Sequence, residues 1–226
     1  MKKILLTILI FFYLQQIGAQ KDNLSDIPVS VFKSKQQEAA KPLIIYVSGD
    51  GGENTFSTDI VSTFNSQGYP VIFFNTLKYF WKKKDPSQAA ADFEKVIGHY
   101  KNELNRGKIW LIGYSMGASV LPFIYNRLSS QTQALINNIV FISPSEQTDF
   151  EVHVSSLFSK DKGESVAAEM SKIAKPFMII QGSDETDMMN TGMLDKRKFS
   201  FLVLKGGHHY NANTDLMVKS IIQNIK

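Results

Sequence analysis

The sequence contains no cysteine, which excludes both a disulfide framework and a lipid anchor attached through a cysteine side chain. It also lacks an apolar segment long enough to span a membrane. The run at residues 4–14 is about 11 residues long, whereas a spanning helix needs about 20. Internal repeats and low-complexity segments are absent as well. A chain of 226 residues, 43% of them hydrophobic, must therefore be stabilised by one ordinary hydrophobic core.

The chain also has little excess charge of either sign. The formal net charge of +4 falls to +2 without Lys2 and Lys3, because two of the 25 basic residues are then lost while all 21 acidic residues remain. Such a balance excludes the strongly basic surface of a nucleic-acid-binding protein. Two short basic clusters, at residues 82–84 and 196–198, could face anionic lipid headgroups or a phosphate-bearing substrate, although most such runs are solvated loop charge.

The first 19 residues have the pattern of a secretory signal peptide. Lys2 and Lys3 precede the short apolar run, and the small residue Ala19 stands at a suitable cleavage point. We therefore expect a periplasmic or secreted protein, with an uncleaved membrane anchor as the alternative. Residues 20–41 form a polar segment, and residues 42–226 are expected to form a single domain.

Within this domain, apolar runs typical of strands alternate with segments of helical periodicity, which predicts an α/β fold with a mostly parallel sheet and helices on both faces. The alternation breaks between residues 145 and 175, and we expect a small cap insertion there that contributes to substrate specificity. The expected strands lie at 43–47, 69–75, 109–112, 138–143, 176–181 and 199–204, and the main helices at 55–67, 86–106, 118–128 and 214–225.

The sequence Gly113-Tyr114-Ser115-Met116-Gly117 lies between an expected strand and an expected helix. This G-x-S-x-G spacing, with a strand before it and a helix after it, is typical of the sharp turn that exposes the nucleophile of a serine hydrolase. Ser115 is therefore the candidate nucleophile.

A serine hydroxyl needs a base to accept its proton and an acid to orient that base. His208 and His209 follow the last expected strand, in the order along the chain that this architecture requires. We favour His209 as the base, because it stands about three residues after the glycine that ends the strand, and keep His208 as the alternative.

Three carboxylates follow the strand at 176–181 and are candidates for the acid. Glu185 and Asp187 rank almost equally, and Asp184 comes behind them as a residue that more often caps a turn or helix. The reaction requires neither a metal nor an organic cofactor.

An acyl-transfer site also needs backbone donors for the developing oxyanion. The expected donors are the amide of Met116 and the glycine-rich loop that contains Gly49, Asp50 and Gly51. A carboxylate at Asp50 would oppose an oxyanion unless it points away or binds a cation, so Asp50 could receive an amino group of the substrate.

Five segments together resemble the bacterial virulence protein VirJ/AcvB family, and the resemblance covers most of residues 42–226. The chain departs from the family pattern at Glu53, where tryptophan is common, and at Ser119, where aspartate is usual. The segments are residues 48–52 (SGDGG), 77–81 (LKYFW), 113–128 (GYSMGASVLPFIYNRL), 150–154 (FEVHV) and 206–210 (GGHHY).

This resemblance implies an α/β-hydrolase fold in the periplasm and, for characterised relatives, removal of the amino acid from aminoacyl-phosphatidylglycerol such as the lysyl lipid. Some relatives also associate with type IV secretion and virulence. The resulting expectation is an exported serine hydrolase acting on a small-molecule or lipid ester, with contact to a membrane surface and secretion-system partners. A general carboxylesterase or thioesterase, or a non-catalytic accessory protein, is the alternative.

Overall fold

The computed structural model describes residues 24–34, 40–153 and 163–225. The expected signal peptide at residues 1–19 lies outside the described residues, as does part of the expected cap. In the described ranges, no helix combines the length and the apolar character needed to cross a bilayer.

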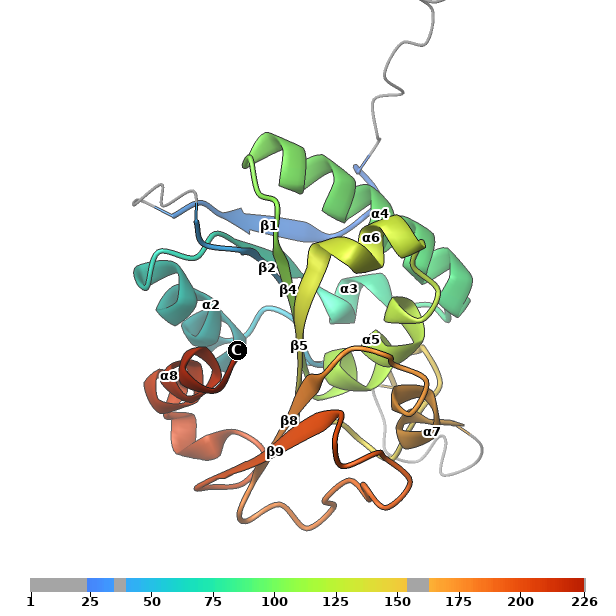
Figure 1. Ribbon diagram of the computed structural model, residues 1–226, viewed down its shortest axis with the longest axis vertical. Coiled ribbons are helices and arrows are strands. Elements are labelled where there is room, and N and C mark those ends of the chain that lie inside the picture. Colours follow the sequence, from blue (N-terminus) through green and yellow to red (C-terminus); the bar gives the residue numbers. More distant parts are fainter. Residues whose placement is uncertain (1–23, 35–39, 154–162, 226) are drawn as a thin grey trace, which may run out of the picture.

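A seven-stranded sheet runs through the centre of the molecule (Figure 1). Its strand order is β1-β3-β2-β4-β5-β8-β9, and every neighbouring pair is parallel except β1 with β3. The mostly parallel sheet that the sequence predicts is thus confirmed. The strands are β1 (Val29–Phe32), β2 (Leu43–Val47), β3 (Val71–Phe74), β4 (Ile109–Tyr114), β5 (Ile136–Ile142), β8 (Phe177–Gly182) and β9 (Phe199–Leu204).

Alternate residues of the central strands enter two separate hydrophobic cores. Ile45 and Leu111 belong to one core, while Tyr46 and Ile112 belong to the other, and all four are fully buried. Both faces of a parallel sheet must be covered, so the strands read as continuous apolar runs with no polar alternation. This pattern explains why β2, β4 and β8 could be located from sequence.

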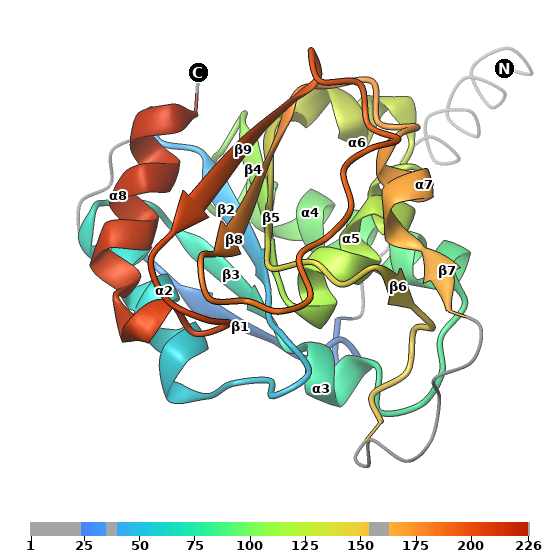
Figure 2. The same ribbon diagram turned by 90° about the horizontal axis from the view of Figure 1, so that it is seen from below.

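Helices cover both faces of the sheet, as Figures 1 and 2 show. Helices α2 (Thr55–Ser66) and α8 (Thr214–Asn224) pack on one face. The opposite face carries α3 (Thr76–Tyr79), α4 (Pro86–Glu103), α5 (Met116–Tyr125) and α7 (Val166–Met170), and α6 (Ser130–Leu135) lies beside β5. Helix α4 begins where the sequence predicts it, because Asp85 accepts hydrogen bonds from the amides of Ser87 and Gln88 and Pro86 occupies the first turn.

Several short elements were missed from the sequence, among them three outside the expected cap, β1, α3 and α6. Strand β1 lies in the segment expected to be merely polar, and it adds an antiparallel edge to the sheet. It is only four residues long and half-buried throughout, so it carries no clear periodic signal. Helices α3 and α6 have four and six residues. They are likewise too short for a helical periodicity to be recognised in the sequence.

Between β5 and β8 the chain forms a two-stranded antiparallel sheet, β6 (Gln147–Thr148) with β7 (Glu164–Ser165), followed by α7. In this region the Val152 amide donates to the Phe80 carbonyl at 2.8 Å, and the Lys84 amide donates to the Phe150 carbonyl at 3.2 Å. These bonds fasten the segment to the chain that follows α3. Figure 2 shows this side of the molecule, with β6 beside α5 and β7 beyond β6.

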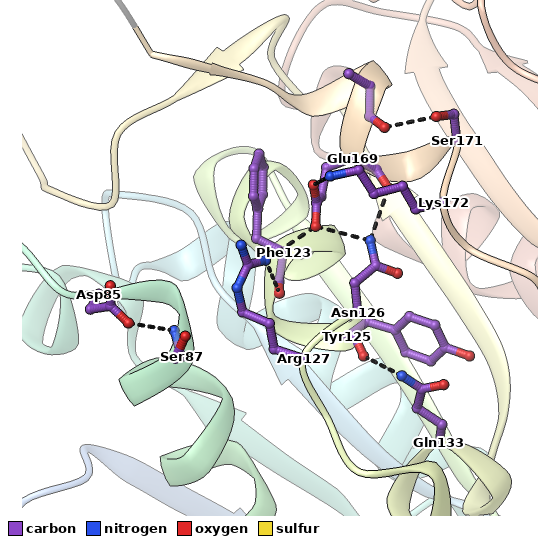
Figure 3. A network of polar contacts seen from close by, with 11 residues as sticks. Asp85, Ser87, Phe123, Tyr125, Asn126, Arg127, Gln133, Glu169, Ser171 and Lys172 are labelled. Carbon is purple, nitrogen blue, oxygen red and sulfur yellow. Dashed lines mark hydrogen bonds and ion pairs between the residues drawn. The ribbon is translucent and has the colours of Figure 1, made fainter.

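A polar network fastens α7 to α5 (Figure 3). The nearly buried carboxylate of Glu169 accepts from Arg127 at 3.1 Å and from Asn126 at 3.1 Å, and it also pairs with Lys172. Burial by itself raises the pKa of Glu169, but the hydrogen bonds from Lys172 and Asn126 outweigh it and hold the pKa below its ordinary value.

Replacing Glu169→Gln keeps the shape of this side chain and removes its charge, so we expect a loss of about 1–2 kcal/mol of stability at pH 7. Because the folded-state pKa is lowered, this contribution is complete above the unfolded-state pKa of about 4.3 and disappears as the pH falls through the folded-state value. Urea unfolding of both proteins at pH 7 and pH 3 measures the difference. A difference that is as large at pH 3 as at pH 7 would contradict the assignment. Asp195→Asn, which removes a pair with the exposed side chain of Arg197, should have a smaller effect.

Candidate active site

Ser115 stands alone between the end of β4 and the start of α5. Its backbone has φ 53° and ψ −120°, a conformation that non-glycine residues rarely adopt. Such a backbone costs about 1–3 kcal/mol and persists only where the surroundings impose it. Here the Ser115 amide donates to the Ile142 carbonyl at 2.8 Å, and the Ser119 amide donates to the Ser115 carbonyl at 3.0 Å. The turn holds the hydroxyl above the carboxyl ends of the strands.

The two glycines of the motif allow the chain to pack this tightly. A Cβ atom at Gly117 would lie 2.3 Å from the Val47 carbonyl oxygen, and one at Gly113 would lie 2.7 Å from the Ala118 backbone. Neither contact can be relieved by moving a side chain, because the opposing atoms belong to the backbone. Because Gly113 and Gly117 have no side chains, α5 can lie directly against the end of β2.

His208 is the histidine that contacts Ser115. Its Nε2 lies 2.9 Å from the Ser115 Oγ. The hydroxyl of Tyr114, the residue before the serine, donates to the His208 carbonyl at 3.0 Å, and the two rings lie 5.2 Å apart. The position of the histidine is thus fixed by a neighbour of the nucleophile itself.

The structure contradicts the preference for His209, because this histidine does not reach Ser115. The His209 ring packs edge-on against Phe56 at 5.3 Å and makes no hydrogen bond to Ser115. The reason is the tight turn formed when the Tyr210 amide donates to the Gly207 carbonyl, since neighbouring side chains of a turn point in different directions. Counting residues from a glycine could not specify which direction each ring takes.

Tyr210 anchors the histidine loop. Its side chain is almost fully buried, and its hydroxyl bonds the Ser143 hydroxyl and the Ile180 carbonyl. Tyr210, Asn211 and Ala212 all have positive φ, within the short turn η1 (Tyr210–Ala212). Backbone strain of this kind often gathers at functional sites, and here it lies directly beside His208.

Glu185 is the carboxylate that reaches His208. Its Oε2 lies 3.6 Å from the His208 Nδ1, while its Oε1 accepts from the Ser143 hydroxyl at 2.6 Å and from the Gly182 amide at 2.8 Å. Burial raises the pKa of Glu185, but its neighbours His208, Ser143 and Gly182 together hold the pKa below its ordinary value. The carboxylate is therefore ionised and fixed next to the ring.

Asp187 and Asp184 do not take this place. The Glu185 amide donates to the Gly182 carbonyl, which folds the chain back and returns the Glu185 side chain to the end of β8. Asp184 is exposed and accepts from the Ser183 hydroxyl at 2.7 Å. Asp187 is exposed and lines a hollow of about 770 Å³ that Glu185 and His208 also line. The near-equal ranking of Asp187 with Glu185 is thus corrected in favour of Glu185.

The expected oxyanion donors surround Ser115. A Cβ atom at Gly49 would lie 3.2 Å from the Ser115 Cβ, so this loop passes close to the nucleophile. Within the described part of the chain, no carbonyl accepts from the amides of Gly49, Asp50 or Met116. The loop is held from behind, because the Thr76 hydroxyl donates to the Ser48 carbonyl at 2.6 Å and the Thr76 amide donates to the Ser48 hydroxyl at 3.0 Å. Gly51 lies further along the same turn and packs toward Asn54.

A cavity of about 350 Å³ opens beside Ser115 and Met116. Its lining includes the carboxylates of Asp50, Asp149 and Glu151, and Asp149 is paired with His153. No lysine or arginine is among the described residues that line it. The described lining therefore carries an excess of acidic side chains next to the candidate nucleophile.

Reasoning from sequence missed Ser143, Asp149 and Glu151 as residues of this site. A signal for Ser143 existed, since it directly follows a buried strand whose carboxyl end faces the same edge as Ser115. The family resemblance marked the segment that contains Glu151, but this irregular segment has no periodicity from which to infer that Asp149 and Glu151 line the cavity.

Comparison with known proteins gave one family match and several structures of similar fold. The family described as bacterial virulence protein (VirJ) matches residues 41–226. The chain belongs to the VirJ family. A search of curated protein sequences gave no significant match.

Solved structures show the α/β-hydrolase fold of this VirJ-family chain. Est1E from Butyrivibrio proteoclasticus with bound ferulic acid has a TM-score of 0.63 at 13% identity, covering 87% of this chain and 93% of that one. A putative dienelactone hydrolase from Klebsiella pneumoniae has a TM-score of 0.65 at 10% identity, covering 88% and 92%. Naproxen esterase from Bacillus subtilis has a TM-score of 0.60 at 12% identity, covering 88% of both chains. The predicted fold is thus confirmed.

Substitution of Gly117→Ala should destabilise the protein by about 3 kcal/mol or more, because the added methyl group meets the backbone of β2. Gly98→Ala is the matched control. Gly98 lies in α4 with nothing within 4 Å of an added Cβ, so alanine there should stabilise by about 0.5–1 kcal/mol. Thermal or urea unfolding measures both, and equal effects of the two substitutions would exclude the proposed close packing.

Proposed function

We propose that this protein is a serine hydrolase that cleaves ester bonds, with Ser115 as nucleophile, His208 as base and Glu185 as the group that orients the histidine. The observation that carries the proposal is the 2.9 Å approach of His208 Nε2 to the hydroxyl of a serine held on a strained turn. A role in packing alone requires neither the strain nor the partly exposed hydroxyl.

The reaction follows from these positions. Ser115 Oγ attacks the ester carbonyl carbon while His208 Nε2 takes its proton, and the ionised Glu185 beside Nδ1 stabilises the protonated ring. The carbonyl oxygen becomes negative and is bound by the amides of Met116 and Gly49. Collapse of this intermediate breaks the bond to the alcohol oxygen, which receives the proton from His208. A water molecule then releases the acyl group from Ser115 by the same steps.

The acidic cavity supports a substrate with a cationic acyl group. Asp50 and Glu151 line the space next to the nucleophile, and neither carboxylate makes an ion pair within the described residues. A carboxylate near the oxyanion opposes the developing charge unless a cation lies between them, and the amino group of an aminoacyl ester supplies such a cation. We therefore propose an aminoacyl ester, and lysyl-phosphatidylglycerol in particular, in line with the resemblance described above. The signal-like residues 1–19 support action outside the cytoplasm.

A fluorophosphonate probe tests the nucleophile directly. The wild-type protein should be labelled at Ser115, and Ser115→Ala should abolish labelling. His208→Ala should reduce the labelling rate by at least about a hundredfold, because the serine loses its base, whereas His209→Ala should change it little. A folded wild-type protein that does not react would contradict the enzymatic proposal and favour a binding protein on the same scaffold.

The substrate proposal is tested by comparing a lysyl ester with the norleucyl ester of the same alcohol, which has a similar shape without the side-chain charge. Replacing Asp50→Asn together with Glu151→Gln should lower the preference for the lysyl ester, measured as a ratio of kcat/KM values, by about tenfold. Asp59→Asn removes an exposed carboxylate from α2 and serves as control. An unchanged ratio in the double variant would contradict recognition of the lysyl side-chain charge by these two carboxylates.

A further inference from the structure

The segment that follows α3 carries an exposed tryptophan next to three lysines. Trp81 is 57% exposed, the largest exposed fraction of any tryptophan, tyrosine or phenylalanine among the described residues. The neighbouring Phe80 is fully buried. Lys82 and Lys83 are exposed, and Lys84 is partly covered, with its ammonium group 5.0 Å from the centre of the Tyr79 ring. We call residues 81–84 the Trp-Lys segment. Packing within the fold explains the positions of Phe80 and Lys84. It does not explain why Trp81, Lys82 and Lys83 are exposed.

The charges of this segment are only weakly compensated. In the part of the chain that the structure describes, neither Lys82 nor Lys83 lies within ion-pair distance of a carboxylate. The nearest carboxylate in sequence, Asp85, already accepts from two backbone amides at the start of α4. The two lysines are therefore available to an external anionic partner.

The Trp-Lys segment also lies beside the rim of the catalytic cavity. Its neighbour Phe80 and its last residue Lys84 are hydrogen-bonded through their backbones to Val152 and Phe150, and Val152 lines the cavity. A second hollow, of about 380 Å³, is lined by Lys83 and Lys84 and by the carboxylates of Asp85, Asp149 and Glu164. It shares Thr148 and Asp149 with the cavity that contains Ser115. In Figure 2 the chain after α3 runs on the same side as β6 and β7.

From this arrangement we propose that the Trp-Lys segment docks the protein on an anionic lipid surface. Indole rings favour the boundary between water and hydrocarbon, where one edge is apolar and the other meets water. Adjacent lysines add attraction to anionic headgroups while their stems lie along the apolar layer. Because the neighbouring Phe80 is buried, the backbone that carries Trp81 is held in place. Docking through Trp81 would bring the lipid surface next to the rim of the cavity.

This inference deepens the proposed function, since docking implies an ester located in that surface, but the two are tested separately. Binding is measured by co-flotation with phosphatidylcholine vesicles that contain or lack phosphatidylglycerol. The wild-type protein should bind the anionic vesicles more tightly, and high salt should weaken this binding. All variants are compared in the same full-length chain, so residues 1–19 contribute equally to each.

Lys82→Ala together with Lys83→Ala should weaken binding to anionic vesicles by more than about tenfold, since each lysine near such a surface is worth about fivefold. The matched control is Lys196→Ala with Lys198→Ala, which removes the same charge from the other basic cluster and should have little effect. Trp81→Ala should weaken binding severalfold, whereas Phe201→Ala, which truncates another exposed aromatic residue, should not.

Tryptophan fluorescence reports the contact itself. Trp81 is exposed while Trp110 is only 6% exposed, so acrylamide quenches mainly Trp81. Anionic vesicles should protect this emission from quenching, and the protection should disappear in Trp81→Phe. Equal binding by the segment variants and the controls, or unprotected Trp81 emission on anionic vesicles, overturns the docking proposal and assigns the segment to another partner, such as a protein.

Activity separates the two proposals. The segment variants should hydrolyse a soluble lysyl ester as fast as the wild-type protein and a vesicle-embedded ester more slowly. Hydrolysis of the soluble ester with no vesicle binding would remove the docking proposal and leave the hydrolase intact. Vesicle binding through Trp81 without hydrolysis of any ester would support the docking proposal and contradict the proposed hydrolase activity.

Discussion

The close contact between the start of α5 and the end of β2 is the constraint on which the site depends. Gly117 lies so near the Val47 and Ser48 carbonyl oxygens that any side chain would collide with them. This contact places the strained Ser115 beside Gly49, and hence the nucleophile beside the candidate oxyanion donors. The strain is maintained because the surrounding backbone belongs to the most buried strands of the sheet.

The remaining parts of the site reach this point through buried polar contacts. Tyr114 holds the His208 backbone, Ser143 joins Glu185 to Tyr210, and Tyr210 in turn anchors the loop that carries His208. These groups come from the carboxyl ends of β4, β5, β8 and β9 or from the loops that follow them. A few hydrogen bonds thus fix four distant segments against one another, which is the second layer of support that a preorganised site requires.

The charges around the site divide into two regions. Carboxylates line the cavity next to the nucleophile, while the exposed lysines of the Trp-Lys segment lie outside its rim. A cavity lined by carboxylates favours a cationic acyl group, and the exposed lysines outside it favour an anionic surface. The two proposals therefore describe one electrostatic arrangement, in which a cationic group is taken from an anionic layer.

The sequence alone determined the fold class, most strand positions and the position of the strand-to-helix turn that carries the candidate nucleophile Ser115. Burial on both faces leaves long apolar runs, and the G-x-S-x-G spacing follows from local sterics. It placed His208, His209 and the carboxylates at 184–187 near the nucleophile, but it did not determine which of them make contact. That choice depends on two tight turns, at residues 182–185 and 207–210, which aim Glu185 and His208 inward. The short strand β1 and the acidic lining at Asp149 and Glu151 were likewise decided only in the tertiary structure. Their positions come from contacts between residues distant in sequence, which local periodicity does not encode.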